Sequence, residues 1–165
     1  MSLEGKRLVI VGDAVCSKNH LLNVFIKNQP KEEEEFTLHD TYSVAIQVEG
    51  KNVLLTLCDT TGQERHPRIR PLSYARTDVI LMCFSIGSPD SLRNVLEIWI
   101  PEVKRYCPDV PIILLGNKKE LRNDPETIVK LSQKNQEPVK VEEGRAAAKE
   151  ISSLVNSIKQ PTQYR

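Results

Sequence analysis

Runs of consecutive apolar residues separated by polar turns mark the predicted strands of this chain. Four such runs have the length and aliphatic content of buried parallel strands; they lie at about residues 6–11, 53–58, 78–84 and 111–116. The segment Tyr42–Val48 instead alternates apolar and polar residues, which is typical of a strand with one wet face. Glu49–Asn52 supplies a turn, so this strand and the next are predicted to form a hairpin.

Apolar residues at helical spacing follow several of these strands. Leu21, Leu22 and Phe25 form a helical stripe that ends near residue 27. A second helix is predicted from Pro89 to about Tyr106, with Ser88 as its N-cap and Pro108 just beyond its end, and a third begins near Glu142. Strands alternating with helices predict a doubly wound α/β domain with a mostly parallel sheet and flanking helices.

Size and composition indicate one domain over residues 1–165. The chain has 165 residues, of which 39% are hydrophobic, enough for one buried core. A formal net charge of +1 gives no reason to expect nucleic-acid binding. The acidic run Glu32–Glu35 is either a solvated loop or a remodelled partner surface.

The cysteines indicate a reducing compartment. Four dispersed cysteines without a paired or metal-ligand spacing, together with the lack of a signal peptide or long apolar span, predict reduced thiols in a cytoplasmic protein. Cys16 is either an inert loop residue or a reactive thiol, because a neighbouring lysine and a helix N-terminus can lower the pKa of a thiol.

A phosphate-binding loop is predicted directly after the first strand. The pattern G-x-x-x-x-G-K-[ST] needs glycines for close backbone approach, a lysine for the outer phosphates and a hydroxyl for Mg²⁺. Gly12 and Lys18 match this pattern, whereas Ser17 replaces the second glycine and Asn19 replaces the hydroxyl residue. If the loop needs a positive φ at Ser17, the side chain adds roughly 1–2 kcal/mol of strain.

Two further motifs follow the carboxyl ends of apolar strands, where open α/β sheets bind ligands. They are Asp59-Thr60-Thr61-Gly62-Gln63-Glu64 and Asn117-Lys118-Lys119-Glu120-Leu121. With the phosphate loop, these motifs resemble the small GTPase superfamily. The segments 70–74, 78–86 and 88–92 are similar to the Rho family, and within it to its RhoA-like members. A segment at about 122–138 resembles the Rho-type helical insertion.

The resemblance implies a P-loop small GTPase fold that binds GTP or GDP with Mg²⁺. The residues that match nucleotide-contacting positions are Gly12, Asp13, Ala14, Val15, Cys16, Ser17, Lys18, Asn19, Thr37, Asp59, Gly62, Asn117, Lys118 and Glu120. Asn19, Thr37 and Asp59 match the magnesium positions. Gln63 matches the catalytic glutamine that orients the attacking water.

Departures from the family pattern predict impaired chemistry. Asn19 is a poorer Mg²⁺ ligand than a hydroxyl residue. Ala14 crowds the space used by Gln63 and by the arginine finger of an activating protein. Glu120 is longer than the aspartate that reads the base, and Pro30 replaces an aromatic residue over it. We therefore expect weakly held GTP or GDP and Mg²⁺, and slow hydrolysis.

The sequence is consistent with three functions. The first is a Rho-type signalling switch with impaired nucleotide binding, whose partners are Rho exchange factors, effectors and activating proteins. The second is a pseudo-GTPase module that sequesters exchange factors without turnover. The third is a chain that keeps the scaffold without a function.

The tail, residues 152–165, diverges from the family pattern. We expect the last strand, the final helix and the Ser-Ala-Lys motif that closes over guanine to be missing, and the sequence up to Lys159 to extend a helix. Their loss would leave one sheet edge and part of one face uncovered. This chain carries no terminal cysteine for lipidation, so no lipid anchor is expected in it.

Overall fold

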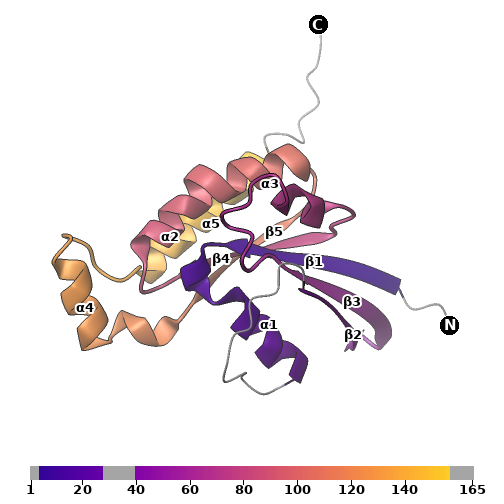
Figure 1. Cartoon of the computed structure of the whole chain (residues 1–165), viewed down its shortest axis with the longest axis horizontal. Coiled ribbons are helices and arrows are strands. Elements are labelled where there is room, and N and C mark those ends of the chain that lie inside the picture. Colours follow the sequence, from indigo (N-terminus) through magenta and orange to yellow (C-terminus); the bar gives the residue numbers. More distant parts are fainter. Residues whose placement is uncertain (1–3, 28–39, 157–165) are drawn as a thin grey trace, which may run out of the picture.

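The computed structural model describes residues 4–27 and 40–156, which form a five-stranded sheet with helices on both faces (Figure 1). The strands are β1 (Glu4–Gly12), β2 (Asp40–Val48), β3 (Lys51–Asp59), β4 (Val79–Ser85) and β5 (Ile112–Asn117). Their spatial order is β2-β3-β1-β4-β5. Only β2 and β3 pair antiparallel, and the other pairs are parallel. The prediction of a mostly parallel α/β sheet is confirmed.

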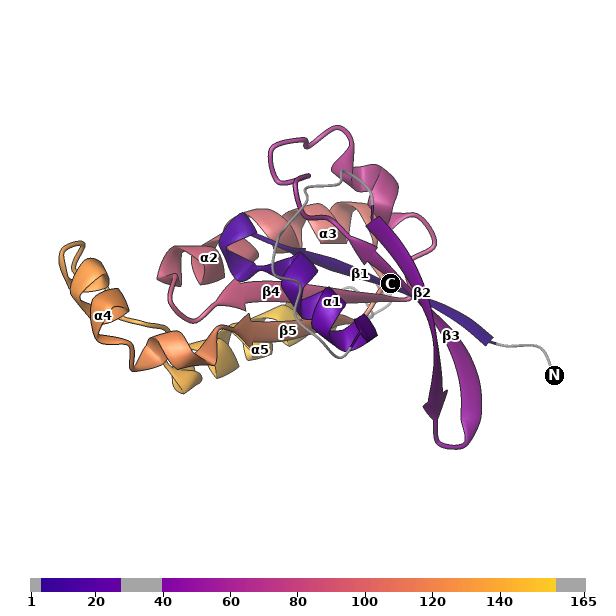
Figure 2. The same ribbon diagram turned by 60° about the horizontal axis from the view of Figure 1, so that its bottom comes forward.

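The helical elements are η1 (Ala14–Cys16), α1 (Lys18–Lys27), η2 (Arg70–Tyr74), α2 (Pro89–Asn94), η3 (Val95–Trp99), α3 (Ile100–Tyr106), η4 (Lys119–Arg122), α4 (Pro125–Ser132) and α5 (Val141–Asn156). Helix α1 covers one face of the sheet, while α2, α3 and α5 cover the other (Figure 1). The β2–β3 hairpin and α4 project at opposite ends of the domain (Figure 2).

Side-chain alternation along β1 divides the core into two layers. Val9 and Val11 pack with Ile80, Trp99 and other residues on the α3 side. Ile10 faces the other way, with Leu22 and Leu57 on the α1 side. Burying each such side chain stabilises the fold by about 1.5–3 kcal/mol, so β1 anchors both layers and fixes the position of the loop that follows it.

The predicted helix from Pro89 to Tyr106 is a continuous helical run, but its middle is a π-helical turn at η3. Pro101 lacks an N–H group and its ring would clash with a carbonyl one turn earlier. The wider turn directly before Pro101 accommodates it. Ser88 occupies the N-cap position with extended backbone, although its side chain makes no capping hydrogen bond.

The hairpin turn is shorter than predicted. Glu49 and Gly50 alone connect β2 and β3, with φ of +49° and +78°. A two-residue turn with both φ positive matches the twist of the strands. Asn52 therefore belongs to β3 rather than to the turn.

The predicted insertion at 122–138 contains α4. Its N-cap Asp124 accepts hydrogen bonds from the Thr127 N–H (2.8 Å) and hydroxyl (2.6 Å). Helix α5 continues to Asn156, which confirms the helical expectation for the tail that far. Among the described residues no strand follows β5, which forms one edge of the sheet. Pro30, Glu32–Glu35, Thr37 and the tail beyond residue 156 lie outside the described residues.

Candidate functional site

The loop after β1 requires glycine at its first position. A Cβ at Gly12 would lie 2.2 Å from the carbonyl oxygen of Cys83, and the φ of Gly12 is +149°. Gly12 and Cys83 are register partners across β1 and β4. The backbone of the loop therefore leaves the sheet in direct contact with β4, an approach that any side chain at position 12 would block.

Ser17 adopts the left-handed conformation that a glycine would favour. Its φ and ψ are 51° and 50°, at the junction of η1 and α1. The Ser17 N–H donates to the Ala14 carbonyl (3.2 Å), which closes the short turn. The predicted condition for strain at Ser17 is thus met, and the residue holds the loop at a cost of roughly 1–2 kcal/mol.

Lys18 lies inside the loop with a side chain that is fully buried. Its ammonium donates to the Gly12 carbonyl (2.7 Å) and to the Asp13 carbonyl (3.1 Å). The same ammonium forms an ion pair with Glu64 from the second motif. All three donors of the lysine therefore have protein partners in this structure.

The third motif contacts the loop directly. Asn117, at the end of β5, donates its side-chain N–H to the Cys16 carbonyl (2.8 Å). Lys118 follows in a left-handed conformation with φ of +59° and is half-buried, whereas Glu120 is exposed. The parallel register places the carboxyl ends of β1, β4 and β5 next to one another. This alignment brings Asn117 into contact with Cys16, which is 101 positions away in the sequence.

The second motif begins beside β1, where Asp59 pairs with Ile10 in register. Asp59 is buried and its carboxylate accepts from the Thr61 N–H (2.9 Å) and hydroxyl (2.6 Å). Gly62 has φ of +83°. Gln63 is fully buried, and its side-chain oxygen accepts from the Ser73 hydroxyl (3.0 Å), in the segment that leads into β4.

The remaining predicted site residues lie around the loop. Ala14 and Val15 are exposed, and Asn19 is half-buried at the start of α1. Thr37 falls outside the described residues. Cys16 is fully buried and its thiol donates to the Cys83 carbonyl (3.2 Å). The interaction with Cys83 and burial raise the pKa of the Cys16 thiol far above its ordinary value. The burial of Cys16 and the raised pKa of its thiol favour an inert core residue over a reactive thiol.

Sequence reasoning missed a clamp on Asp13. The two carboxylate oxygens of Asp13 accept from the Trp99 indole N–H and the Asn94 amide, both at 2.7 Å. These donors lie at the junction of α2, η3 and α3. They hold the phosphate loop against the helix layer. No sequence pattern marks this contact, because Trp99 and Asp13 are 86 positions apart.

A second cluster joins the second motif to the same helices. Arg70 is buried, lies over the Trp99 ring (4.7 Å) and donates to both carboxylate oxygens of Glu102 (2.7 and 2.5 Å). It also donates to the carbonyls of Gln63 and Glu64. Burial alone would raise the pKa of Glu102, but hydrogen bonds from Arg70 and Tyr74 lower it below its ordinary value.

The three motifs thus meet at the carboxyl ends of β1, β3 and β5, around Lys18. The sequence model of the Ras family matches residues 7–159. The chain belongs to the Ras family of small GTPases. Domains of this family are GTP-binding signalling switches that bind GTP or GDP with Mg²⁺ and contact exchange factors, effectors and activating proteins.

The described residues of this small GTPase fit a bound nucleotide in part. The backbone of the loop lies directly against β4 at Gly12, and Asn117 donates to the loop, so the first and third motifs are in contact, as a nucleotide site of this family would require. The ammonium of Lys18 in this loop is paired with Glu64. Within residues 4–27 and 40–156, no three His, Cys, Asp or Glu side chains cluster as a metal site. No helix in those ranges is long and apolar enough to cross a membrane.

Proposed function

We propose that this chain is a Rho-type GTPase domain, closest to RhoA-like members, that acts as a signalling switch with weak nucleotide binding and slow hydrolysis. The Rho assignment rests on the family-like segments at 70–74, 78–86 and 88–92, and on the helical insertion at 122–138, where α4 lies. One domain over residues 1–165 is the organisation that we propose with it.

The observation that carries the proposed impairment is the ion pair between Lys18 and Glu64. An incoming phosphate must displace a carboxylate that is only 15% exposed from an ammonium that is fully buried. The Glu64 carboxylate and a phosphate carry the same sign of charge and compete for the same donors. Binding therefore requires both the loss of this pair and a shift of the second motif.

The roles of the other residues follow from their places around the loop. Residues 12–19 would surround the phosphates, while Asn117, Lys118 and Glu120 would face the base. Asn19 and Thr37 would hold Mg²⁺ directly, with Asp59 beside them. The ion, when bound, would neutralise phosphate charge. The longer side chains of Asn19 and Glu120 would hold their ligands less well than the family residues do.

Slow hydrolysis follows from the position of Gln63. We propose that Gln63 orients the attacking water, which requires its side chain to leave Ser73 and turn toward the phosphates. By resemblance to the family, Ala14 stands where a glycine lies close to that water, so its methyl group would crowd the glutamine. Both features oppose the catalytic arrangement that the glutamine needs.

The first prediction tests the competition at Lys18. Replacing Glu64 with glutamine should tighten the binding of a fluorescent GDP analogue by at least about tenfold, because the competing negative charge is removed from a buried site. The purified wild-type chain should carry well under one GDP per molecule by extraction and chromatography.

The double change Ser17→Gly with Asn19→Thr should also tighten the binding of GDP. The glycine relieves the backbone strain at position 17, and the threonine restores a hydroxyl ligand for Mg²⁺.

Glu150→Gln is the matched control, because Glu150 is exposed on α5 and lies outside the three motifs. It should leave the affinity for GDP unchanged. A wild-type chain that purifies with one tightly held GDP per molecule would show that Lys18 is available to nucleotide.

A second candidate function is a pseudo-GTPase module that sequesters Rho exchange factors without turnover. The internal pairing of Lys18 favours it, because the loop has satisfied partners without a nucleotide. We predict that a Rho exchange factor is retained in a pull-down longer than an effector, in the absence of added nucleotide. Retention of the effector alone would count against this candidate.

Activating proteins are further proposed partners of the chain. We propose no nucleic-acid partner, and we propose the cytoplasm as the location of the chain.

A further inference from the structure

Asp13 begins the phosphate loop, but its side chain turns away from it. The residue occupies the N-cap position of η1 with extended backbone, and within the described residues its carboxylate makes no capping hydrogen bond. An aspartate at an N-cap position usually accepts from N–H groups two or three residues later. Its backbone carbonyl does accept, from the Cys16 N–H and from the Lys18 ammonium, both at 3.1 Å. The backbone of Asp13 thus shapes the loop while its charge is directed elsewhere.

Two donors of the helix layer hold the Asp13 carboxylate. The Trp99 indole N–H donates to one oxygen and the Asn94 side-chain amide to the other, both at 2.7 Å. Trp99 is only 4% exposed, so its N–H depends on a protein partner. The negative charge of the carboxylate strengthens both hydrogen bonds. Because each oxygen has its own donor, the orientation of the carboxylate is fixed.

The π-helical turn at η3 explains how both donors reach one carboxylate. Asn94 and Trp99 are five positions apart, which would place them about 140° apart around an α-helix with 3.6 residues per turn. In η3 the Ile100 N–H instead donates to the Val95 carbonyl, five residues earlier. A turn of this width brings residues five apart toward the same side of the helix, and such turns are frequent at functional sites. The distortion of this helix therefore directs two donors at the loop.

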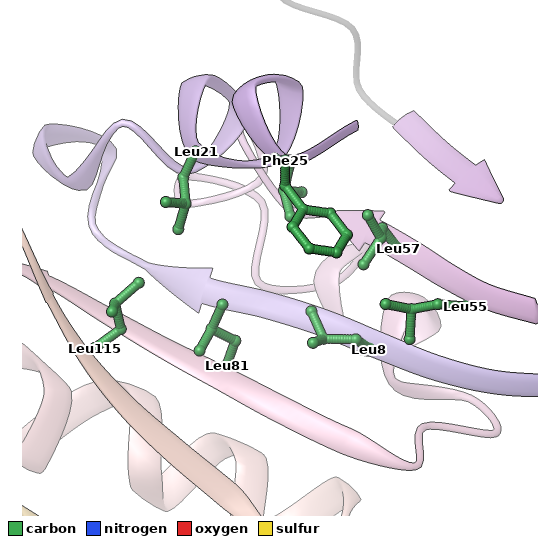
Figure 3. A pocket seen from close by; sticks show the side chains of 8 residues that line it. Leu8, Leu21, Phe25, Leu55, Leu57, Leu81 and Leu115 are labelled. Carbon is green, nitrogen blue, oxygen red and sulfur yellow. The ribbon is translucent and has the colours of Figure 1, made fainter. Parts of the chain in front are cut away.

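Helix α1, which follows the loop, is held to the sheet by apolar contacts. Leu21 and Phe25 point from α1 toward Leu8, Leu81 and Leu115 on the strands (Figure 3). Every described residue around the cavity of about 260 Å³ between them is a leucine or Phe25. Apolar contacts are non-directional, so they do not determine which way a carboxylate in the loop points. The direction of the Asp13 side chain depends on the donors of the helix layer.

We propose that Asn94 and Trp99 are positioning residues for phosphate binding, which hold the Asp13 carboxylate away from the loop N–H groups that a phosphate would occupy. This inference rests on the proposed nucleotide-binding function. A released carboxylate would turn onto these N–H groups, because a side chain at an N-cap position reaches them. It would then compete with a phosphate of the same charge for the same donors. Glu64 competes for Lys18 in this structure, whereas the helix layer withdraws Asp13 from such competition.

The test combines Trp99→Phe with Asn94→Leu in the full chain, which removes both donors. Phenylalanine keeps an aromatic ring beneath the Arg70 guanidinium, and leucine is close to asparagine in size. The affinity for a fluorescent GDP analogue should fall by at least about fivefold. Adding Asp13→Ala to this double variant should restore the affinity to within about twofold of the wild type, because the competing carboxylate is gone. If the two donors served packing alone, the triple variant would bind as weakly as the double variant.

Amide hydrogen exchange of the nucleotide-free chain, followed by NMR, tests the position of Asp13 directly. In the double variant the Val15 amide should exchange more slowly than in the wild type, because the released carboxylate accepts from its N–H and repels hydroxide. Loosened packing would accelerate the exchange of the same amide. If the double variant does not fold, Asn94→Leu alone decides through the sign of the change in Val15 exchange.

Ile98→Ala is the matched control, because Ile98 lies in the same π-helical turn with a side chain that is 48% exposed. It should change neither the affinity for GDP nor the exchange of Val15. Three results would overturn the inference: an unchanged affinity in the double variant, a triple variant that binds no better than the double variant, and faster Val15 exchange. A wild-type chain without measurable affinity for GDP would refute the proposed function, and Val15 exchange would then decide this inference on its own.

Discussion

Gly12→Ala should destabilise the domain by at least about 4 kcal/mol, a large share of the stability of a single domain. The added methyl carbon would lie 2.2 Å from the Cys83 carbonyl oxygen, and the φ of +149° is unfavourable for alanine. The clash cannot be relieved by a side-chain rotation, because its partner is the backbone of β4. Relief requires β1 and β4 to separate where both core layers meet.

Gly5→Ala is the matched control for this change. Gly5 lies on the same strand, and an added methyl group there would meet nothing within 4 Å. Urea unfolding followed by circular dichroism should place this control within about 1 kcal/mol of the wild type. A Gly12→Ala protein that unfolds at the same urea concentration as the control would mean that the loop can move away from β4 cheaply.

The local features of the site could be predicted from the sequence. The three motifs follow apolar strands, and parallel strands place their carboxyl ends at one edge. The positive φ of Ser17 follows from its place where the motif has glycine. Pro101 could also have marked the distortion of the helix that contains it, because a proline inside a helix removes a hydrogen bond. In each case the information lies within a few residues.

Long-range pairings could not be predicted in this way. Glu64 meets Lys18 across 46 positions and Trp99 meets Asp13 across 86. Several charged or polar residues could have occupied these places with equal local propensity. The burial of Gln63 and Cys16 was equally hidden, because it depends on how the segment before β4 and helix α1 pack on the sheet. These contacts determine whether the motifs can act on a ligand.

Arg70 links these hidden contacts, and Arg70→Ala should cost about 3–5 kcal/mol in the free energy of unfolding. The side chains of Arg70 and Glu102 are only 5% and 16% exposed, so removing the guanidinium leaves a carboxylate nearly without solvent. The change also removes the stacking on Trp99 and the bonds to the Gln63 and Glu64 carbonyls. Hydrogen exchange of the amides at 63–70 should therefore accelerate along with the loss of stability.

Arg93→Ala provides the comparison. The side chains of Arg93 and its partner Asp90 are 57% and 51% exposed, so this ion pair should contribute no more than about 1 kcal/mol to the free energy of unfolding.

The sign of the pH dependence of the Arg70→Ala effect follows from Glu102. Its pKa is lowered in the folded chain, so the contribution of the pair is fully present above the ordinary value of 4.5 and is lost as the pH falls through the folded value. The difference between wild type and Arg70→Ala should therefore shrink in acid. A difference that is independent of pH would assign the effect to packing on Trp99 rather than to the ion pair.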